Sequence, residues 1–242
     1  MPLTEEIRQI TAHGCTLKES GRYNEAEACY LEAVKKIDKE DKELMGTLYI
    51  DLGKNAEDDN RLDDALKYYS EAISHLEGCK GEPILENAHT HFNMARIYLE
   101  KMDNKNALDH AERALEHDMR YPFTAPADLA DARAMHLIAV AFVGNPLNKQ
   151  VLFDTWACLK AVPFKLLNYQ LTSQFLLILL PALRTLDPDV YQCAMNEMQS
   201  WAGRDVAEEV SMLVEQGPSG LRVSTLRKRL QRSLLRLPDI DK

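Results

Sequence analysis

Glycine and proline are scarce in this 242-residue sequence, which contains ten of each. Because these two residues interrupt helices more strongly than any others, their scarcity favours long helices. Long apolar runs are also missing: the strongest, at residues 175–180, is six residues long, whereas a membrane-spanning helix needs about 20. The first residues contain no basic stretch followed by an apolar one, as a secretory signal would. These absences predict a soluble, cytoplasmic protein.

Catalytic and metal-binding motifs are absent as well. The five cysteines are scattered, with no CxxC or Cys/His ligand spacing, which is typical of reduced thiols in a reducing compartment. The seven histidines show no HExxH grouping, and the sequence has neither a phosphate-binding glycine loop nor a GxSxG elbow. We therefore expect no enzyme activity, no catalytic residue, no cofactor and no metal site.

The formal net charge of −9 is unevenly distributed along the chain. Residues 1–120 contain 26 acidic and 16 basic residues, a net charge of −10. Residues 218–242, by contrast, contain 2 acidic and 7 basic residues, a net charge of +5. An acidic body would repel phosphates, which disfavours nucleic acid binding by that part of the chain.

An internal repeat is the strongest pattern in the sequence. Its unit is a small residue followed by an alanine twelve positions later and a second alanine seven positions after that. Three copies fit this spacing: Gly14, Ala26 and Ala33; Gly53, Ala65 and Ala72; and Ala95, Ala107 and Ala114. The copies recur after 39 and then 42 residues.

This spacing indicates two helices per copy, joined by a short turn. A small residue on the first helix, such as Gly14 or Gly53, permits close approach of the second helix, and Ala26 and its equivalents permit the same from the other side. Tyr30 and Tyr69 are expected to face the next copy. Since one helix pair cannot bury its apolar face alone, stacked neighbours would supply the core.

The pattern over residues 7–120 resembles the tetratricopeptide repeat, because three copies match in one register. The resemblance implies an all-α fold, a right-handed superhelical solenoid of antiparallel helix pairs with additional C-terminal helices. The copies are longer than about 34 residues, the usual length of this repeat. The extra residues, at 38–43 and 78–83, are expected to lengthen the second helix of a pair or to form the loop between pairs.

The repeats are expected to occupy residues 1–164, at about 7–44, 46–84 and 88–122, with a degenerate fourth copy at 132–164. The fourth copy keeps the spacing through Ala139, Val151 and Cys158, but its turn is altered and two alanines are replaced. A plain helical hairpin is the alternative interpretation of this segment.

Residues 165–217 do not follow the repeat spacing. They are predicted to form further helices that continue or cap the solenoid, one of them at about 189–201, or a small separate domain. Residues 218–242 are predicted to form a basic amphipathic helix, with leucines near a helical period and six basic side chains elsewhere: Arg222, Arg227, Lys228, Arg229, Arg232 and Arg236. Such a helix could pack on the last repeat, or bind a membrane surface, an acidic partner or the acidic body itself.

In the tetratricopeptide family, the first helix of each pair lines a concave groove. The register places these side chains there: Arg8, Thr11, Cys15 and Lys18 from the first pair; Thr47, Ile50, Asp51, Lys54 and Asp58 from the second; and His89, Phe92, Asn93, Arg96 and Glu100 from the third. The fourth copy would add Arg133, His136 and Val140. This mixture of charged and apolar residues is typical of a peptide-binding groove, although any exposed helix face would contain a similar mixture.

Some family members bind the C-terminal carboxylate of cytosolic chaperones with lysine, arginine and asparagine side chains. The equivalent positions on this chain are Thr11, Cys15, Asp51, His89 and Asn93. None of them matches, and Asp51 would repel a carboxylate. We therefore expect no chaperone-tail binding of that kind.

The resemblance implies a non-catalytic scaffold or adaptor that binds a peptide or helix of a partner protein in its groove. One alternative is a regulatory sensor that changes shape when a peptide binds. Another is an assembly or peripheral membrane subunit that the basic C-terminal helix anchors. An uncapped repeat end would also favour self-association.

Overall fold

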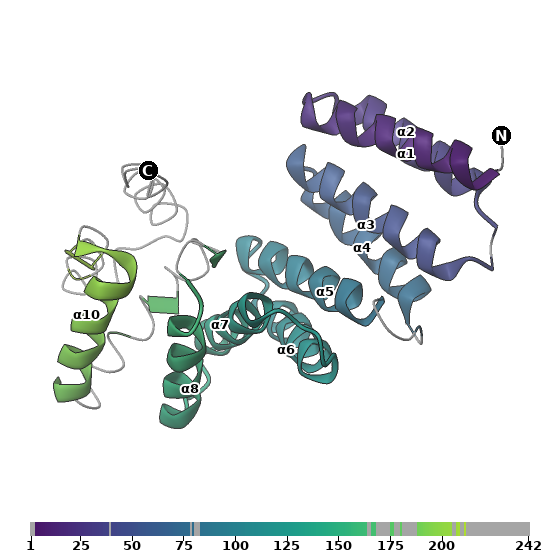
Figure 1. The fold of residues 1–242 in the computed structure, drawn as a ribbon. Helices are drawn as coiled ribbons and strands as arrows, with labels where there is room; N and C mark the ends of the chain where they lie inside the picture. The colour runs from purple at the N-terminus through teal and green to yellow at the C-terminus, as the bar shows by residue number, and fades with distance from the viewer. Residues whose placement is uncertain are drawn as a thin grey trace. The chain divides into compact units, whose positions relative to one another are not determined.

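A computed structural model describes residues 3–38, 40–77, 79, 83–163, 166–167, 175–176, 180, 188–204, 207–208 and 211. The regular secondary structure of these residues is helical and includes no strand (Figure 1). The helices are α1 (Leu3–Glu19), α2 (Tyr23–Lys36), α3 (Lys42–Asp58), α4 (Leu62–Leu76), α5 (Pro83–Glu100), α6 (Asn104–Arg120), α7 (Pro126–Val143), α8 (Lys149–Lys160) and α10 (Pro188–Ala202). They belong to two compact units, Met1–Pro122 and Phe123–Lys242. The predicted all-α fold is confirmed.

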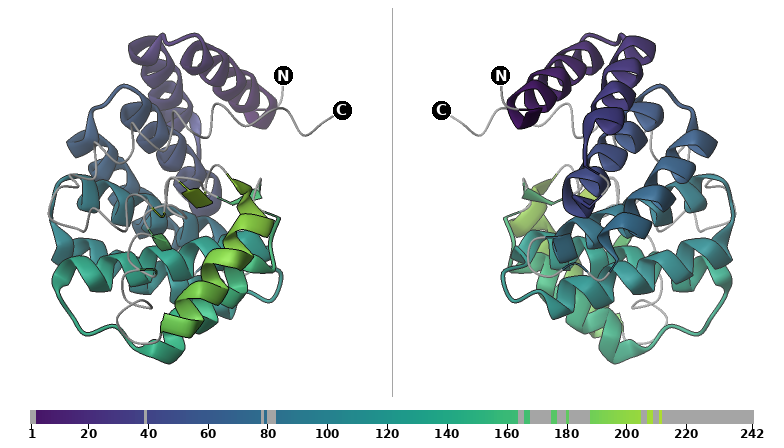
Figure 2. Two further views of the ribbon diagram at one scale, coloured as in Figure 1. Left: turned by 90° about the vertical axis from the view of Figure 1, so that its left-hand side faces the viewer. Right: turned by 90° about the vertical axis from the view of Figure 1, so that its right-hand side faces the viewer.

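The first unit contains three helix pairs in succession, α1/α2, α3/α4 and α5/α6 (Figures 1 and 2). The helices of each pair pack along each other, and α2 packs on α3 as α4 packs on α5. Each pair therefore shares its buried face with the next, as the repeat spacing predicted. The alanines of the pattern are fully buried at all seven positions: Ala26, Ala33, Ala65, Ala72, Ala95, Ala107 and Ala114.

The turn inside each pair has the same backbone geometry in all three copies. Gly21, Asn60 and Met102 occupy equivalent positions, with φ angles of 74°, 60° and 61°. The amide of the following residue donates to a carbonyl in the last turn of the first helix: Arg22 to Leu17 at 2.9 Å, Arg61 to Ala56 at 2.8 Å and Asp103 to Tyr98 at 2.9 Å. This is the Schellman arrangement, which satisfies carbonyls that the helix leaves free.

Met102 adopts this left-handed conformation although it has a Cβ atom, which costs about 1–2 kcal/mol relative to right-handed backbone. Its side chain is 66% exposed, so its removal would lose little packing. We expect Met102→Gly to raise the free energy of unfolding by about 0.5–1 kcal/mol. This is the strain that the substitution relieves minus the cost of the conformational entropy that glycine adds to the unfolded chain. Urea denaturation would measure the change.

The matched control for that prediction is Gly21→Ala, at the equivalent position of the first pair. A Cβ atom added at Gly21 would have no neighbour within 4 Å, but it would be attached to a left-handed backbone. The substitution should therefore destabilise the protein while Met102→Gly stabilises it. If the two changes had the same sign, backbone strain would not be their common cause.

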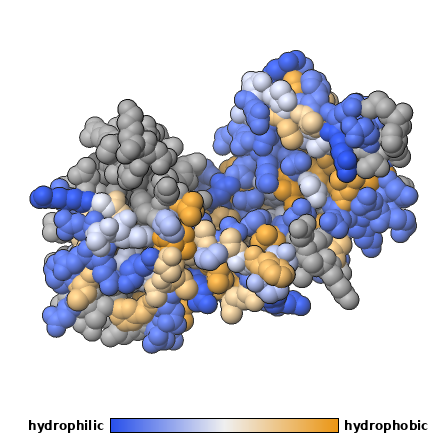
Figure 3. All heavy atoms as spheres, in the orientation of Figure 1, coloured by the Kyte–Doolittle hydropathy of each residue, from blue (hydrophilic) through white to orange (hydrophobic). Residues whose placement is uncertain are grey.

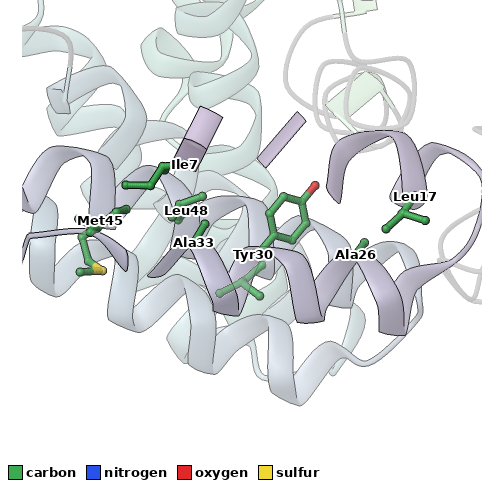
Figure 4. Close-up of a cluster of buried hydrophobic side chains, with 9 residues drawn as sticks. Ile7, Leu17, Ala26, Tyr30, Ala33, Met45 and Leu48 are labelled. Carbon is green, nitrogen blue, oxygen red and sulfur yellow. The ribbon is translucent and has the colours of Figure 1, made fainter. Parts of the chain in front are cut away.

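The rings of Tyr30 and Tyr69 belong to core clusters that include residues of the next pair, as predicted, and they also fill space inside their own helix pair. A Cβ atom added at Gly14 would lie 2.9 Å from Tyr30 Cε1, and one added at Gly53 would lie 2.4 Å from Tyr69 Cε1. Both rings are fully buried, and Figure 4 shows Tyr30 among the buried side chains of the first core cluster. The ring occupies the volume that a larger residue on the first helix would take.

In the first of the two segments that lengthen the repeats, residues 38 and 40–41 lie between α2 and α3, and residues 42–43 begin α3. Helix α2 ends at Lys36, and α3 begins at Lys42. The carboxylate of Asp41 accepts a hydrogen bond from the Leu44 amide at 3.1 Å and so caps α3. The second helix of the first pair is therefore not extended, and between α2 and α3 the loop alternative is the one observed.

The second unit contains the helix pair α7/α8, whose buried face differs from the predicted one. Ala139 is fully buried as expected, but Val151 is 37% exposed, and the buried side chains of α8 include Leu152 and Leu159 instead. The connection over residues 144–148 is longer than the turns of the first three pairs. It shifts the buried face of α8 by one residue.

Two tryptophans join α8 to α10. Their rings pack edge to face with centroids 5.5 Å apart, Trp156 Nε1 donates to Glu197 Oε2 at 3.1 Å, and Trp201 Nε1 donates to the Val162 carbonyl at 3.0 Å. Buried indoles thus keep a hydrogen-bond partner. The helix predicted at about 189–201 is observed as α10. The six basic residues predicted for the C-terminal helix, Arg222 to Arg236, lie outside the described residues.

Candidate functional site

An open groove with a volume of about 580 Å³ lies between α1 and α3, the first helices of two successive pairs. Helix α1 contributes Ile7, Arg8, Thr11, Ala12 and Cys15, and α3 contributes Glu43, Leu44, Thr47, Leu48 and Asp51, with Asp41 just before it. Because these positions recur every three or four residues, one face of each helix lines the groove. In Figure 3, the visible face of the molecule is mainly hydrophilic and is interrupted by hydrophobic residues.

Two carboxylates give the groove its electrostatic character. Asp51 is half-buried, and burial raises the pKa of its carboxyl, an effect that Lys54 and Lys18 partly oppose. Glu86 of α5 accepts a hydrogen bond from the Thr47 hydroxyl at 3.1 Å, between Oγ1 and Oε2. Burial also raises the pKa of Glu86, and the hydrogen bond from Thr47 partly opposes that rise. Both groups are therefore poorly solvated carboxylates beside an open groove.

Most basic side chains near these carboxylates are paired with other acids. Lys18 Nζ lies 3.6 Å from Asp58 Oδ2, which joins α1 to α3. Arg96 of α5 pairs with Glu57 of α3, and Glu57 in turn accepts a hydrogen bond from the Tyr69 hydroxyl at 3.1 Å. These pairs connect the first helices of neighbouring repeats.

The structure brings together some of the predicted groove residues. Arg8, Thr11, Cys15, Thr47 and Asp51 line the groove between α1 and α3. The predicted residues of α5 lie on the next first helix and do not line it: His89 is exposed, whereas Phe92, Asn93 and Arg96 are half-buried. Lys54 is exposed on α3, and Lys18 is half-buried in its ion pair.

The assignment of Ile50 to the groove surface is wrong. Ile50 is 6% exposed and belongs to a core cluster that includes Met94 and Ile97 of α5. Successive residues of a helix are about 100° apart, so Ile50 cannot face the same way as Asp51. The sequence reasoning also missed Glu43 and Glu86; Glu43 lies one helical turn before Thr47 and could have been found from that spacing.

A second cluster, between α5 and α6, consists of three histidines and a tyrosine. His91 Nδ1 and His110 Nδ1 are 2.8 Å apart, so one ring donates a hydrogen bond to the other. His91 also stacks on His117, and His110 stacks on Tyr98. Burial, reinforced by His110, lowers the pKa of His91 to about 3, and burial also lowers the pKa values of His110 and His117. The cluster is thus a neutral aromatic stack at pH 7.

Within the described parts of the chain, no group of three or more histidine, cysteine, aspartate or glutamate side chains is arranged to hold a metal ion. Among those same residues, no helix combines the length and the apolar character that crossing a bilayer requires.

Comparison with known proteins agrees with the helix-pair architecture. The tetratricopeptide repeat family model matches residues 11–35, the end of α1 and most of α2. No curated protein sequence matches the chain. Among 29 matching solved chains is a crystal structure from Podosopora anserina, described as TPR-like repeats of a protein assigned as a kinesin light chain. It is 13% identical, covers 96% of this chain and 99% of its own, and has a TM-score of 0.51.

At 13% identity this likeness concerns the fold alone, and the repeat itself rests on the family match and the register. The matched segment contains Gly14 to Ala33, the residues whose equivalents recur in α3/α4 and α5/α6. The turns, the buried alanines and the pairwise packing repeat with them. Together these findings show a helical-repeat fold similar to that of tetratricopeptide repeat proteins, with the family match itself confined to residues 11–35.

Proposed function

We propose that this protein is a non-catalytic scaffold that binds a peptide or a helix of a partner protein in the groove between α1 and α3. Tetratricopeptide repeats generally mediate protein–protein interactions. The observation that supports this site is the open groove itself, which combines apolar side chains with Thr11, Thr47 and Asp51. Its volume of about 580 Å³ is within the usual range for ligand sites.

The composition of the groove suits a peptide better than a small polar metabolite. Ile7, Ala12, Leu44 and Leu48 provide apolar contacts, and the threonines and carboxylates around them provide hydrogen-bonding groups. Apolar anchors surrounded by polar groups are typical of protein interfaces. The predicted α5 residues Phe92 and Asn93 would extend the binding surface beyond this groove, and that extension stays a prediction.

A bulky residue at Ala12 provides a direct test, because Ala12 is exposed on α1 and lines the groove. We expect Ala12→Trp to fill the space and to abolish capture of the partner in an affinity pulldown from lysate. A tryptophan that keeps one anchor side chain of the partner out of the groove should cost about 2 kcal/mol or more, roughly a thirtyfold loss of affinity. Titration with the purified partner would measure the loss directly.

The matched control is Ala28→Trp, which places the same side chain at an exposed position on α2 that does not line the groove. Both variants should retain the helical circular dichroism of the wild type. A partner that binds Ala12→Trp as tightly as wild type would exclude this groove as the site. Arg96 is a poor position for such a test, because it pairs with Glu57, the acceptor of the buried Tyr69 hydroxyl.

A further inference from the structure

We propose that the groove between α1 and α3 selects a basic partner segment, in which an arginine or lysine is flanked by apolar side chains. The inference rests on the proposed function and specifies the chemistry of the partner. It follows from the negative charge that the ion pairs of the described residues leave unbalanced in the groove.

The acidic side chains of the groove outnumber its available bases. Asp41 and Glu43 lie at one end of the lining, Asp51 lies on the same face of α3, and Glu86 reaches Thr47 from α5. Glu43 and Asp51 both contribute to raising the pKa of Glu86, so the three carboxylates lie within electrostatic range of one another. Repulsion among them is relieved by a cation in the groove.

The bases of this region do not neutralise that charge. Arg8 lies 3.9 Å from Glu5, Lys18 pairs with Asp58, and Arg96 pairs with Glu57. Among the described residues, Asp51 and Glu86 have no ion-pair partner within 4.0 Å. Lys54 is the remaining base near both; it is exposed and forms no such pair in the described chain. An excess of negative charge is therefore left beside apolar lining residues.

An arginine of a partner peptide satisfies both features of this site. Its guanidinium has five N–H donors that can reach two carboxylates, and its aliphatic stem can lie on the apolar residues between them. Burial of Asp51 and Glu86 strengthens such hydrogen bonds, because the surroundings screen charge less than water does. An acidic peptide or a nucleic acid would be repelled by the same carboxylates.

The test uses the full chain and a fluorescein-labelled synthetic helix with arginine and leucine at helical spacing and alanine elsewhere. Its counterpart has glutamine in place of every arginine. We expect the arginine peptide to bind more tightly in fluorescence anisotropy, and Asp51→Asn with Glu86→Gln to weaken that binding about tenfold or more. Both substitutions keep hydrogen-bond acceptors and remove charges that burial already disfavours, so the fold should persist.

The control for net charge is Glu71→Gln with Glu116→Gln, which removes two exposed carboxylates from α4 and α6. That variant should bind the arginine peptide nearly as tightly as wild type. Equal weakening by both double variants, or equal binding of the two peptides, would overturn the proposal. If the two peptides bound equally and Ala12→Trp still abolished binding, the groove would remain the binding site, and only its preference for basic partners would be rejected. If Ala12→Trp changed neither peptide nor lysate-partner binding, the proposed function itself would fall.

Discussion

Gly53→Ala is expected to destabilise the protein by about 1–3 kcal/mol, the usual cost of overpacking a core, although alanine is the better helix former by about 1 kcal/mol. The added Cβ atom would lie 2.4 Å from Cε1 and 2.5 Å from Cδ1 of Tyr69. The ring cannot turn away easily, because it is fully buried and its hydroxyl donates to Glu57. Thermal or urea denaturation would measure the loss.

Two further variants separate overpacking from a general effect of substitution. Gly14→Ala should be much milder, since its Cβ atom would lie 2.9 Å from Tyr30 Cε1 and 3.2 Å from the next ring atoms. In a Tyr69→Ala background, Gly53→Ala should become stabilising by up to about 1 kcal/mol, because only helix propensity then remains. If the sign did not reverse, contact with the ring would not be the cause.

Lowering the pH from 7.5 to 5.5 is expected to destabilise the first unit through the histidine stack of α5 and α6. His91 has a pKa of about 3 when folded and an ordinary value of 6.5. The unfolded chain therefore binds more protons than the folded chain between these pH values, and stability falls as the pH falls below about 6.5. His91 alone would cost about 1.4 kcal/mol at pH 5.5. His110 and His117, whose pKa values are also lowered, would add to this cost.

Urea denaturation at the two pH values would measure this effect. The control is the double variant His91→Phe with His110→Phe, which keeps aromatic rings in the stack but removes two of its three titrating histidines. Its stability should change less with pH than that of the wild type. As an independent measure, NMR of the histidine side chains should find His91 neutral in the folded protein at pH 5.5. A protonated His91 under those conditions would contradict the explanation.

The helix pairs of the first unit could be predicted because their spacing depends on local packing. The positions of Ala26 and Ala33 require small side chains because two helices touch there. Alanine therefore recurs at the equivalent positions of every copy. The contact of the Tyr30 ring with Gly14 inside its own pair could not be predicted in this way, because a large residue near a helix contact can pack against either neighbour. In α8, the altered connection before Lys149 decides which side chains are buried, and spacing alone does not encode that rotation.

The candidate site was predictable only in part. Thr11, Thr47 and Asp51 follow the helical period of the groove face and do line the groove. Ile50 was placed there although it is adjacent to Asp51, and a helix turns adjacent residues to different faces. Glu86 reaches the site through a hydrogen bond between α3 and α5, and no pattern within one helix indicates such a contact.

The pairing of Gly14 with Tyr30 and of Gly53 with Tyr69 has a consequence for the exchange of parts between repeats. The equivalent residues of the third pair, Ala95 and Ala111, are both fully buried, so the volume is divided differently there. The second helices of the first two pairs should be interchangeable at this contact. A chimaera that transplanted α4 onto α5 would instead place a tyrosine ring over an alanine, and the reverse graft would leave a void. The first two pairs thus share a glycine–tyrosine contact, and the third has an alanine–alanine contact. Replacing one contact by the other requires substitutions on both helices of the pair.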